Sequence, residues 1–238
     1  MHEPTVESEH TDEEILRLLG GISYQASVAL QRASSFENLE ETFVSTVEAL
    51  ANALEANDEY TSSHTRWITD MALRVGEAMG FEGVQLKQLE LGALFHDIGK
   101  IGIPTSILLK PGPLSPEERT IIEMHPELGE RILEPIERLA EVRTIVRSCH
   151  ERWDGAGYPD KKAGEAIPLE ARIILVCDAF HAMTTDRPYR KRLSCEEACR
   201  RLREASGTQF DPDVVDVFLG LPIEMPQPHD AADERLAS

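Results

Sequence analysis

The sequence predicts an all-α fold, and two features of the chain support this class. Apolar residues recur at the i, i+3, i+4, i+7 spacing of a helix face, first at Ile15, Leu18, Leu19 and Ile22. The aromatic fraction is only 5%, as expected for a helical protein rich in Ala, Leu and Glu. A chain of 238 residues with this pattern fits one helical bundle with appendages.

The periodic segments divide the chain into helices between two polar ends. Residues 1–11 are acidic and residues 222–238 carry three prolines, so both are predicted to be disordered tails. A helix is expected from about Asp12 to Ala33, weakened at Gly20 and Gly21, and another from about Asn38 to Ala56. Further helices are expected at 61–80, 83–98, 115–123, 126–146, 168–185, 194–205 and 211–219. This gives an N-terminal helical extension at 12–43 and a main domain at 44–221.

The first apolar stripe has two interpretations. It packs on its own domain, or it pairs with a second copy and makes a homodimer through the N-terminal helices. Two Pro/Gly-rich pieces, "IGIPTSILLKPGPL" and "DGAGYPDKKAGEAIP", form the long connections of the main domain. Long loops inside compact domains usually carry function.

Charge and composition exclude several classes of partner. The net charge is −19, which argues against binding a nucleic-acid polymer or an anionic membrane surface. No apolar run reaches the ~18 residues of a membrane span, and the acidic opening does not resemble a secretory signal. We therefore expect a cytoplasmic protein. The four cysteines form no CxxC pair, so they are expected to be reduced thiols.

Imidazole and carboxylate side chains recur along the main domain at a regular distance. Successive sites lie 25 to 32 residues apart, about one helical hairpin each, so successive helices of a bundle can deliver them to one centre. The candidate metal ligands are His64, His96, Asp97, His125, His150 and Asp178. A buried His beside Asp also occurs without metal, as a hydrogen-bonded pair, and this alternative applies to His96 and Asp97.

Two basic features stand out in this acidic chain. Lys100 follows Asp97 by one turn and either contacts a phosphate oxygen or is solvated. The "RPYRKR" run either clamps an anion or forms a solvated helix face.

Asp178 follows an apolar run, where an unpaired carboxylate is costly unless it is protonated, hydrogen-bonded or bound to metal. Mixed nitrogen and oxygen ligation suits Fe, Mn or Zn, and two close ions favour in-line attack of a bridging hydroxide on a phosphoester.

The chain is similar to the HD-GYP family, a branch of the HD-domain phosphohydrolases. The similarity runs from about Val44 to Leu219, roughly three quarters of the sequence. It rests on ordered motifs: "DEYTSSHTRW", "HDIGKIGIP", "LLKPGPLSPEE", "MHPELGERIL", "HERWDGAGYP" and "DRPYR".

The resemblance implies an all-α HD-domain bundle with two metal ions, sometimes three, that hydrolyses cyclic di-GMP to linear pGpG, with GMP as a further product. Fe or Mn is expected first, and Zn, Ni or Mg are alternatives. The six candidate ligands match the family's ligands, with Asp97 or Asp178 bridging the ions. The implied catalytic residues are Asp97, Lys100 and Asp178, and the implied substrate-binding residues are Lys100, Tyr158, Arg187 and Arg190.

The chain departs from the family pattern at three positions. Cys149 replaces the first His of a His-His pair, and it is either a ligand or a small packed residue. Tyr60 stands where members with three metals carry Glu, which argues against a third ion. His181 replaces an Asp one turn after Asp178, and it can be a ligand or a partner of one.

Two other functions fit the same motifs. The first is an HD phosphohydrolase acting on another cyclic dinucleotide or on a nucleotide, because residues that handle metal and phosphate do not read the base. The second is a non-catalytic module that binds a cyclic dinucleotide or serves as a scaffold for signalling proteins. Retention of the six candidate ligands and of Lys100 favours an enzyme.

Overall fold

The computed structural model describes residues 6–55, 62–186 and 191–223. Every regular element in these ranges is a helix, and the only β-type pairing among them is a single bridge between Ser206 and Phe210. The predicted all-α class is therefore confirmed. The chain divides into two compact units, residues 1–47 and 48–238.

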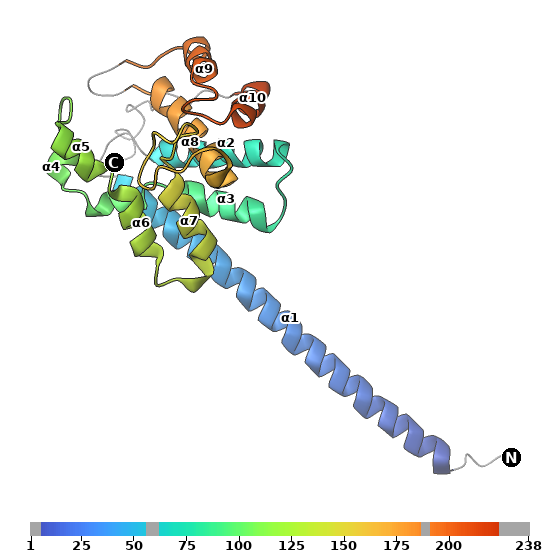
Figure 1. The fold of residues 1–238 in the computed structure, drawn as a ribbon. Coiled ribbons are helices and arrows are strands. Elements are labelled where there is room, and N and C mark those ends of the chain that lie inside the picture. Colours follow the sequence, from blue (N-terminus) through green and yellow to red (C-terminus); the bar gives the residue numbers. More distant parts are fainter. Residues whose placement is uncertain (1–5, 56–61, 187–190, 224–238) are drawn as a thin grey trace, which may run out of the picture. The chain divides into compact units, whose positions relative to one another are not determined.

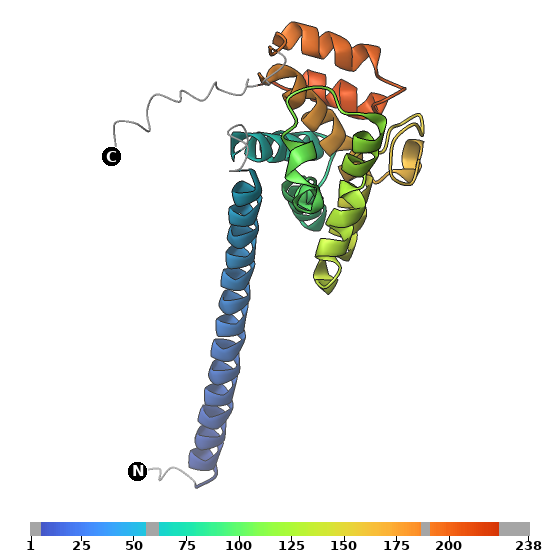
Figure 2. The ribbon, with the colours of Figure 1, turned by 90° about the vertical axis from the view of Figure 1, so that its left-hand side faces the viewer.

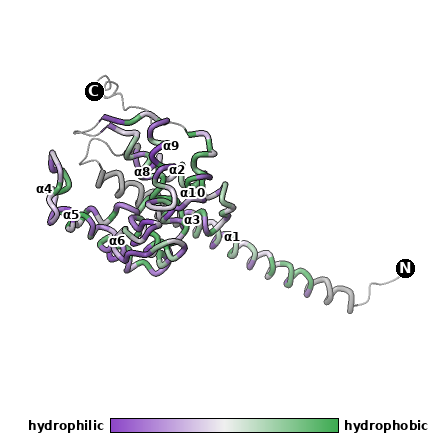
Figure 3. The backbone as a smooth tube through the Cα atoms, turned by 45° about the horizontal axis from the view of Figure 1, so that its top comes forward, coloured by the Kyte–Doolittle hydropathy of each residue, from purple (hydrophilic) through white to green (hydrophobic). Residues whose placement is uncertain are grey.

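The described part of the N-terminal unit is one uninterrupted helix, α1 (Val6–Glu55), whose last residues, 48–55, are counted with the second unit (Figure 1). The sequence predicted two helices here, and α1 also begins inside the segment predicted to be a disordered tail. Gly20 and Gly21 lie within α1, because glycine costs a helix only about 1 kcal/mol each and does not end it. Figure 3 shows hydrophobic and hydrophilic residues alternating along this helix.

The second unit holds the remaining helices. They are α2 (Ser62–Ala78), α3 (Val84–Phe95), η1 (Ile98–Gly102), α4 (Thr105–Leu108), α5 (Pro116–Ile122), α6 (His125–Leu133), η2 (Glu137–Leu139), α7 (Ala140–Ser148), η3 (Gly164–Ala166), α8 (Leu169–Thr184), α9 (Cys195–Glu204) and α10 (Pro212–Gly220). The prediction of a single helix at 126–146 is wrong, because the helical structure is interrupted between α6 and α7. Pro135 lies in this break: it has no backbone N–H to continue the helix, and inside a helix its ring would clash with the carbonyl of the residue four positions earlier.

The core of this unit forms around α8. This helix contacts α2, α3, α7, α9 and α10, while α2 also packs on α3, and α6 packs on α7 and η1. Figures 1 and 2 show α6 and α7 side by side and α9 and α10 next to α8. The largest side chains fully buried in this core are Ile68, Leu89, Ile167, Ile173, Ile174, Phe180, Leu202 and Phe218. Since α8 is surrounded by helices, its sequence is apolar on nearly all sides.

Two glycines let the short helix η1 lie directly on α6. A methyl group at Gly99 would overlap the carbonyl oxygen of His125 and the amide nitrogen of Gly129. A methyl group at Gly129 would lie 2.9 Å from a methyl carbon of Val146 on α7. The backbone that follows Asp97 is therefore in contact with the first turn of α6, where His125 is located.

Within the described residues, no helix is both long enough and apolar enough to cross a bilayer. The cytoplasmic location and the domain boundaries expected from the sequence stay predictions.

Candidate metal centre

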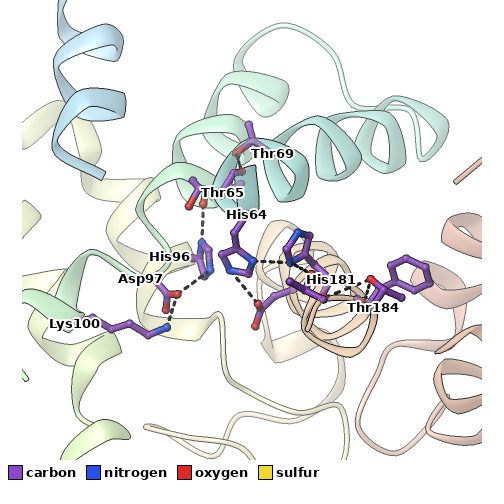
Figure 4. A network of polar contacts seen from close by, with 12 residues as sticks. His64, Thr65, Thr69, His96, Asp97, Lys100, His181 and Thr184 are labelled. Atoms are coloured by element: carbon purple, nitrogen blue, oxygen red, sulfur yellow. Dashed lines mark hydrogen bonds and ion pairs between the residues drawn. The ribbon is translucent and has the colours of Figure 1, made fainter. Parts of the chain in front are cut away.

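The candidate ligands come from five helices and meet in one region of the second unit. His64 lies on α2, His96 and Asp97 follow α3, and His125 begins α6. His150 follows α7, and Asp178 lies on α8. Figure 4 shows His64, His96 and Asp97 pointing toward one another, with Lys100 beyond Asp97 and His181 on the opposite side of His64.

Asp97 is the centre of this arrangement, because its two carboxylate oxygens face different partners. Oδ2 lies 3.4 Å from Nε2 of His96 and 2.5 Å from Nζ of Lys100. Oδ1 lies 3.4 Å from Nε2 of His125. One carboxylate thus contacts the end of α3 on one side and the start of α6 on the other.

The ligands form two groups that share Asp97. In the first group, one donor atom from each of His64, His96 and Asp97 lies within 4.8 Å of the others. In the second group, the same holds for Asp97, His125 and His150. These are the only such groups among the residues that the structure describes. Asp178 borders the first group, with Oδ1 3.6 Å from Nε2 of His64.

Backbone carbonyls fix the orientation of two imidazoles. Nδ1 of His96 lies 2.7 Å from the carbonyl oxygen of Ala93, and Nδ1 of His125 lies 2.8 Å from that of Ile122. Because a carbonyl oxygen can only accept, each Nδ1 must carry the proton that it donates. In the neutral form of each ring, Nε2 then carries a lone pair, and it faces Asp97.

These lone pairs suit a metal ion. Nε2 of His96, His125 and His150 and Oδ1 of Asp97 are buried atoms without a hydrogen-bond partner. Leaving a buried polar atom unpaired costs about 1–3 kcal/mol, so a cluster of such atoms calls for an explanation. Bound cations supply one, since they would satisfy all four atoms, and imidazole with carboxylate is a common ligand set for divalent transition metals.

Burial and neighbouring charges shift the pKa values of these ligands in opposite directions. Burial disfavours the charged form of every ring, yet the adjacent Asp97 carboxylate outweighs it and raises the pKa of His96 to about 9. Burial, together with the nearby His125, lowers the pKa of His150 to about 3. Burial would raise the pKa of Asp97, but Lys100 and His96 hold it well below its usual range. Asp97 therefore stays ionised.

The loop after His150 brings Tyr158 back over the site. Its backbone turns at Gly155, which has a φ of 75°. A methyl group at Gly157 would overlap the backbone of residues 150–152, so only glycine fits this approach. The amide of Tyr158 donates to the carbonyl of His150 over 3.2 Å. The Tyr158 ring then stacks on that of His150, with centroids 5.2 Å apart and planes 13° from parallel.

Glu151 is a buried residue beside the site that the sequence did not single out. Its side chain is 1% exposed, and Oε1 accepts a 2.6 Å hydrogen bond from the amide of Asp160. Burial raises the pKa of this carboxyl group. Glu151 therefore ties the loop, two residues after Tyr158, to the end of α7. Its only signal in the sequence is its position in the "HERWDGAGYP" motif.

The two remaining ligand candidates, Cys149 and His181, have different surroundings. The Cys149 thiol donates to the carbonyl of Ile145 over 3.2 Å and lies in the hydrophobic core, where burial raises its pKa well above the usual value. Cys149 is thus packed in the core and belongs to neither group. Nδ1 of His181 lies 2.7 Å from Nδ1 of His64, so it contacts a ligand candidate directly.

Four other residues were singled out in the sequence: Lys100, Arg187, Arg190 and Tyr60. Lys100 is at the site, with 38% of its side chain exposed beside Asp97. Arg187 and Arg190, expected to bind substrate, lie outside the described residues, as does Tyr60.

Comparison with known proteins gives a family and several relatives. A family model described as "HD domain" matches residues 48–214. The chain is 39% identical over 188 residues to a cyclic di-GMP phosphodiesterase response regulator, RpfG, from Xanthomonas campestris, covering 78% of this chain and 50% of that protein. It is 40% identical over 194 residues to a cyclic di-GMP phosphodiesterase from Thermotoga maritima, covering 80% and 52%.

A third relative is named for a different substrate. A 3′3′-cGAMP-specific phosphodiesterase from Vibrio cholerae is 31% identical over 205 residues, covering 85% of this chain and 39% of that protein. This chain therefore spans about half, or less, of the length of these three relatives.

One solved structure confirms the type of fold. A cyclic GMP-AMP specific phosphodiesterase from V. cholerae superimposes with a TM-score of 0.55 at 23% identity, covering 74% of this chain and 47% of that chain.

Substitutions should separate the two ligand groups. Wild-type protein is expected to bind two Mn²⁺ ions per chain, and His150→Ala one ion, because it removes a donor from the second group only. Asp97→Asn should weaken both sites by at least about tenfold, since both groups lose their shared carboxylate. Metal analysis after equilibrium dialysis measures this, with the surface variant Asp154→Asn as a control. Loss of a single ion in Asp97→Asn would contradict a shared role.

Proposed function

The chain belongs to the HD-domain family, and from this premise we propose that it is a metal-dependent phosphodiesterase that hydrolyses a cyclic dinucleotide, with cyclic di-GMP as the first candidate. The observation that carries the proposal is the Asp97 carboxylate shared by two groups of imidazoles, each with one buried and one half-buried ring. Such a pair of adjacent sites fits two-metal hydrolysis of a phosphoester. The relatives named as cyclic di-GMP phosphodiesterases give the substrate class.

The proposed ligands of the two metal ions are the six residues expected from the sequence: His64, His96, Asp97, His125, His150 and Asp178. Fe or Mn is the first candidate for this donor set, with Zn, Ni or Mg as alternatives. Bound there, the ions would lower the pKa of water and polarise the phosphoryl group. Asp97 is the bridging candidate that the geometry favours, because its two oxygens face different groups.

Lys100 is the proposed catalytic cation of the protein itself. Asp97 holds its ammonium group at the site, and part of the side chain is exposed to an incoming substrate. From this position Lys100 can offset the negative charge that develops on the phosphoryl oxygens during hydrolysis. It also reduces the repulsion between an anionic substrate and a chain of net charge −19.

Tyr158, Arg187 and Arg190 are the proposed contacts to the phosphates and bases of the substrate. Burial and the nearby Asp97 raise the pKa of Tyr158, so its phenol stays protonated and can donate a hydrogen bond. The two arginines suit bidentate binding of phosphate. Departure of the ribose 3′ oxygen from one phosphodiester would give linear pGpG from cyclic di-GMP, and GMP would require a second cut.

A second substrate has support from one relative. The 3′3′-cGAMP-specific protein retains 31% identity over most of this chain, so a mixed cyclic dinucleotide is the alternative substrate. The residues around the metals act on phosphate, which both substrates share.

We also propose that α1 pairs with α1 of a second copy. The apolar residues Ile15, Leu19 and Ile22 are 48%, 54% and 64% exposed. Their spacing of four and then three residues places them on one face of the helix, the pattern of a coiled-coil seam. A second copy would bury this face without any further partner.

The pairing predicts a change in assembly. The double variant Leu19→Glu with Ile22→Glu should sediment as a monomer at concentrations where the wild-type protein is a dimer, because it places charges in the seam. Arg17→Glu changes the net charge equally but lies on the opposite face, so it should leave the dimer intact. A monomeric wild-type protein would contradict the pairing.

Turnover on a substrate panel tests the proposed activity. Anaerobically prepared, metal-loaded protein should convert cyclic di-GMP to pGpG, with cyclic GMP-AMP and mononucleotides as comparison substrates. Lys100→Ala should lower kcat by about 10²–10³, the effect of removing one group that stabilises developing charge. Lys87→Ala, which removes a surface pair with Glu90, is the matched control and should act like wild type.

Two outcomes would overturn the proposal. Cleavage of mononucleotides alone would reject cyclic dinucleotides as the substrate class. Tight binding of the dinucleotide at full metal occupancy without any cleavage would favour the binding module.

A further inference from the structure

His181 is a buried imidazole in direct contact with a proposed metal ligand. It lies on α8, is 2% exposed, and packs against the ring of Trp67 with centroids 5.2 Å apart. Trp67 in turn stacks on Phe180, at 5.7 Å and 14° from parallel. The His181 ring is thus held by packing on α2 and α8, and its position relative to His64 is set by the fold.

The contact between the two imidazoles couples their protonation. Nδ1 of His64 lies 2.7 Å from Nδ1 of His181, a hydrogen-bond distance. Two protons between these nitrogens would clash, and two lone pairs would repel. One ring must therefore donate through Nδ1 while the other accepts. When both rings are neutral, the tautomer of one ring therefore fixes the tautomer of the other.

The tautomer of His64 decides what it presents to the site. Its Nε2 lies 3.6 Å from Oδ1 of Asp178, and a donor atom of His64 lies within 4.8 Å of donor atoms of His96 and Asp97. If His64 donates through Nδ1, Nε2 carries a lone pair that can bind a cation. If His181 donates instead, the Nε2 of a neutral His64 carries a proton, and a cation is excluded.

Building on the proposed function, we propose that His181 is a positioning residue that accepts the Nδ1 proton of His64 and so presents His64 Nε2 to the metal ion of the first group. Nδ1 of His181 is then occupied by this hydrogen bond and does not bind metal. The hydroxyl of Thr185 lies 3.2 Å from the same nitrogen and can share this acceptor. Hydrogen bonds from a ligand imidazole to a neighbouring acceptor orient the ring and strengthen its metal binding.

The proposal is specific to one of the two groups. The second group, formed by Asp97, His125 and His150, includes neither His64 nor His181. Its His125 already donates through Nδ1 to the backbone carbonyl of Ile122. Loss of the acceptor at residue 181 should therefore lower the affinity for the ion of the first group and leave the affinity for the other ion unchanged.

Metal titration of the full chain tests this role. His181→Leu replaces the imidazole with an apolar side chain of similar size that offers no acceptor. One Mn²⁺ should then bind about 10–100-fold more weakly, while the other binds as in wild type. His181→Asn places an amide oxygen near the former Nδ1 and should restore binding to near the wild-type value. Thr185→Val removes the secondary contact alone and should keep both ions.

Several results would overturn the proposal. Wild-type affinity for both ions in His181→Leu would show that no acceptor is needed. Equal losses in His181→Leu and His181→Asn would indicate that the imidazole itself binds metal. A loss in Thr185→Val as large as in His181→Leu would assign the role to the hydroxyl group instead.

A second measurement does not depend on the folding of any variant. In wild-type protein with ¹⁵N-labelled histidine and bound Zn²⁺, Nδ1 of His64 should show the shift of a protonated nitrogen and Nδ1 of His181 that of an unprotonated one. The reverse assignment would contradict the proposal. The first experiment reads metal affinity and the second reads nitrogen protonation, and neither reads turnover. A failure of cyclic dinucleotide hydrolysis would therefore leave this inference standing, and a failure here would not decide the substrate.

Discussion

The charge of Asp97 is the constraint on which the rest of the site depends. Its carboxylate lies between imidazoles from two sides, with Nε2 of His96 and of His125 each 3.4 Å away, and beside the Lys100 ammonium. These neighbours keep it ionised despite burial. Its Oδ1, however, is a buried atom without a hydrogen-bond partner, which is unfavourable in a folded protein. Bound cations would satisfy this oxygen and the Nε2 atoms of His96, His125 and His150, which also have no hydrogen-bond partner.

The fold meets this constraint by close backbone contact. Gly99 lets the chain after Asp97 lie on the first turn of α6, which brings His125 to the second carboxylate oxygen. Carbonyls one turn upstream of His96 and His125 orient both rings. For His64, which lies on α2, the group next to Nδ1 is the side chain of His181 and not a backbone carbonyl. In the first group, one ring is thus oriented by a backbone carbonyl and the other by a side chain.

The sequence predicted most of the residues that the structure brings together around Asp97, because a helical bundle allows one ligand candidate per helix and the motifs are well separated. It did not predict the details that depend on tertiary contact. Pro135 was visible in the sequence, but its effect in ending α6 was missed. The environment of Cys149 follows from geometry: adjacent residues on a helix diverge by about 100°, so Cys149 turns to the core while His150 faces the site. The partners of Glu151 and His181 are set by packing between distant segments.

Anomalous diffraction from crystals of Mn²⁺-loaded protein is the most direct test of the central claim. We expect two manganese peaks per chain, about 3.5–4 Å apart, with Asp97 bonded to both ions. His64 and His96 should contact one ion, and His125 and His150 the other. A single peak, or two ions that share no bond to Asp97, would contradict the account.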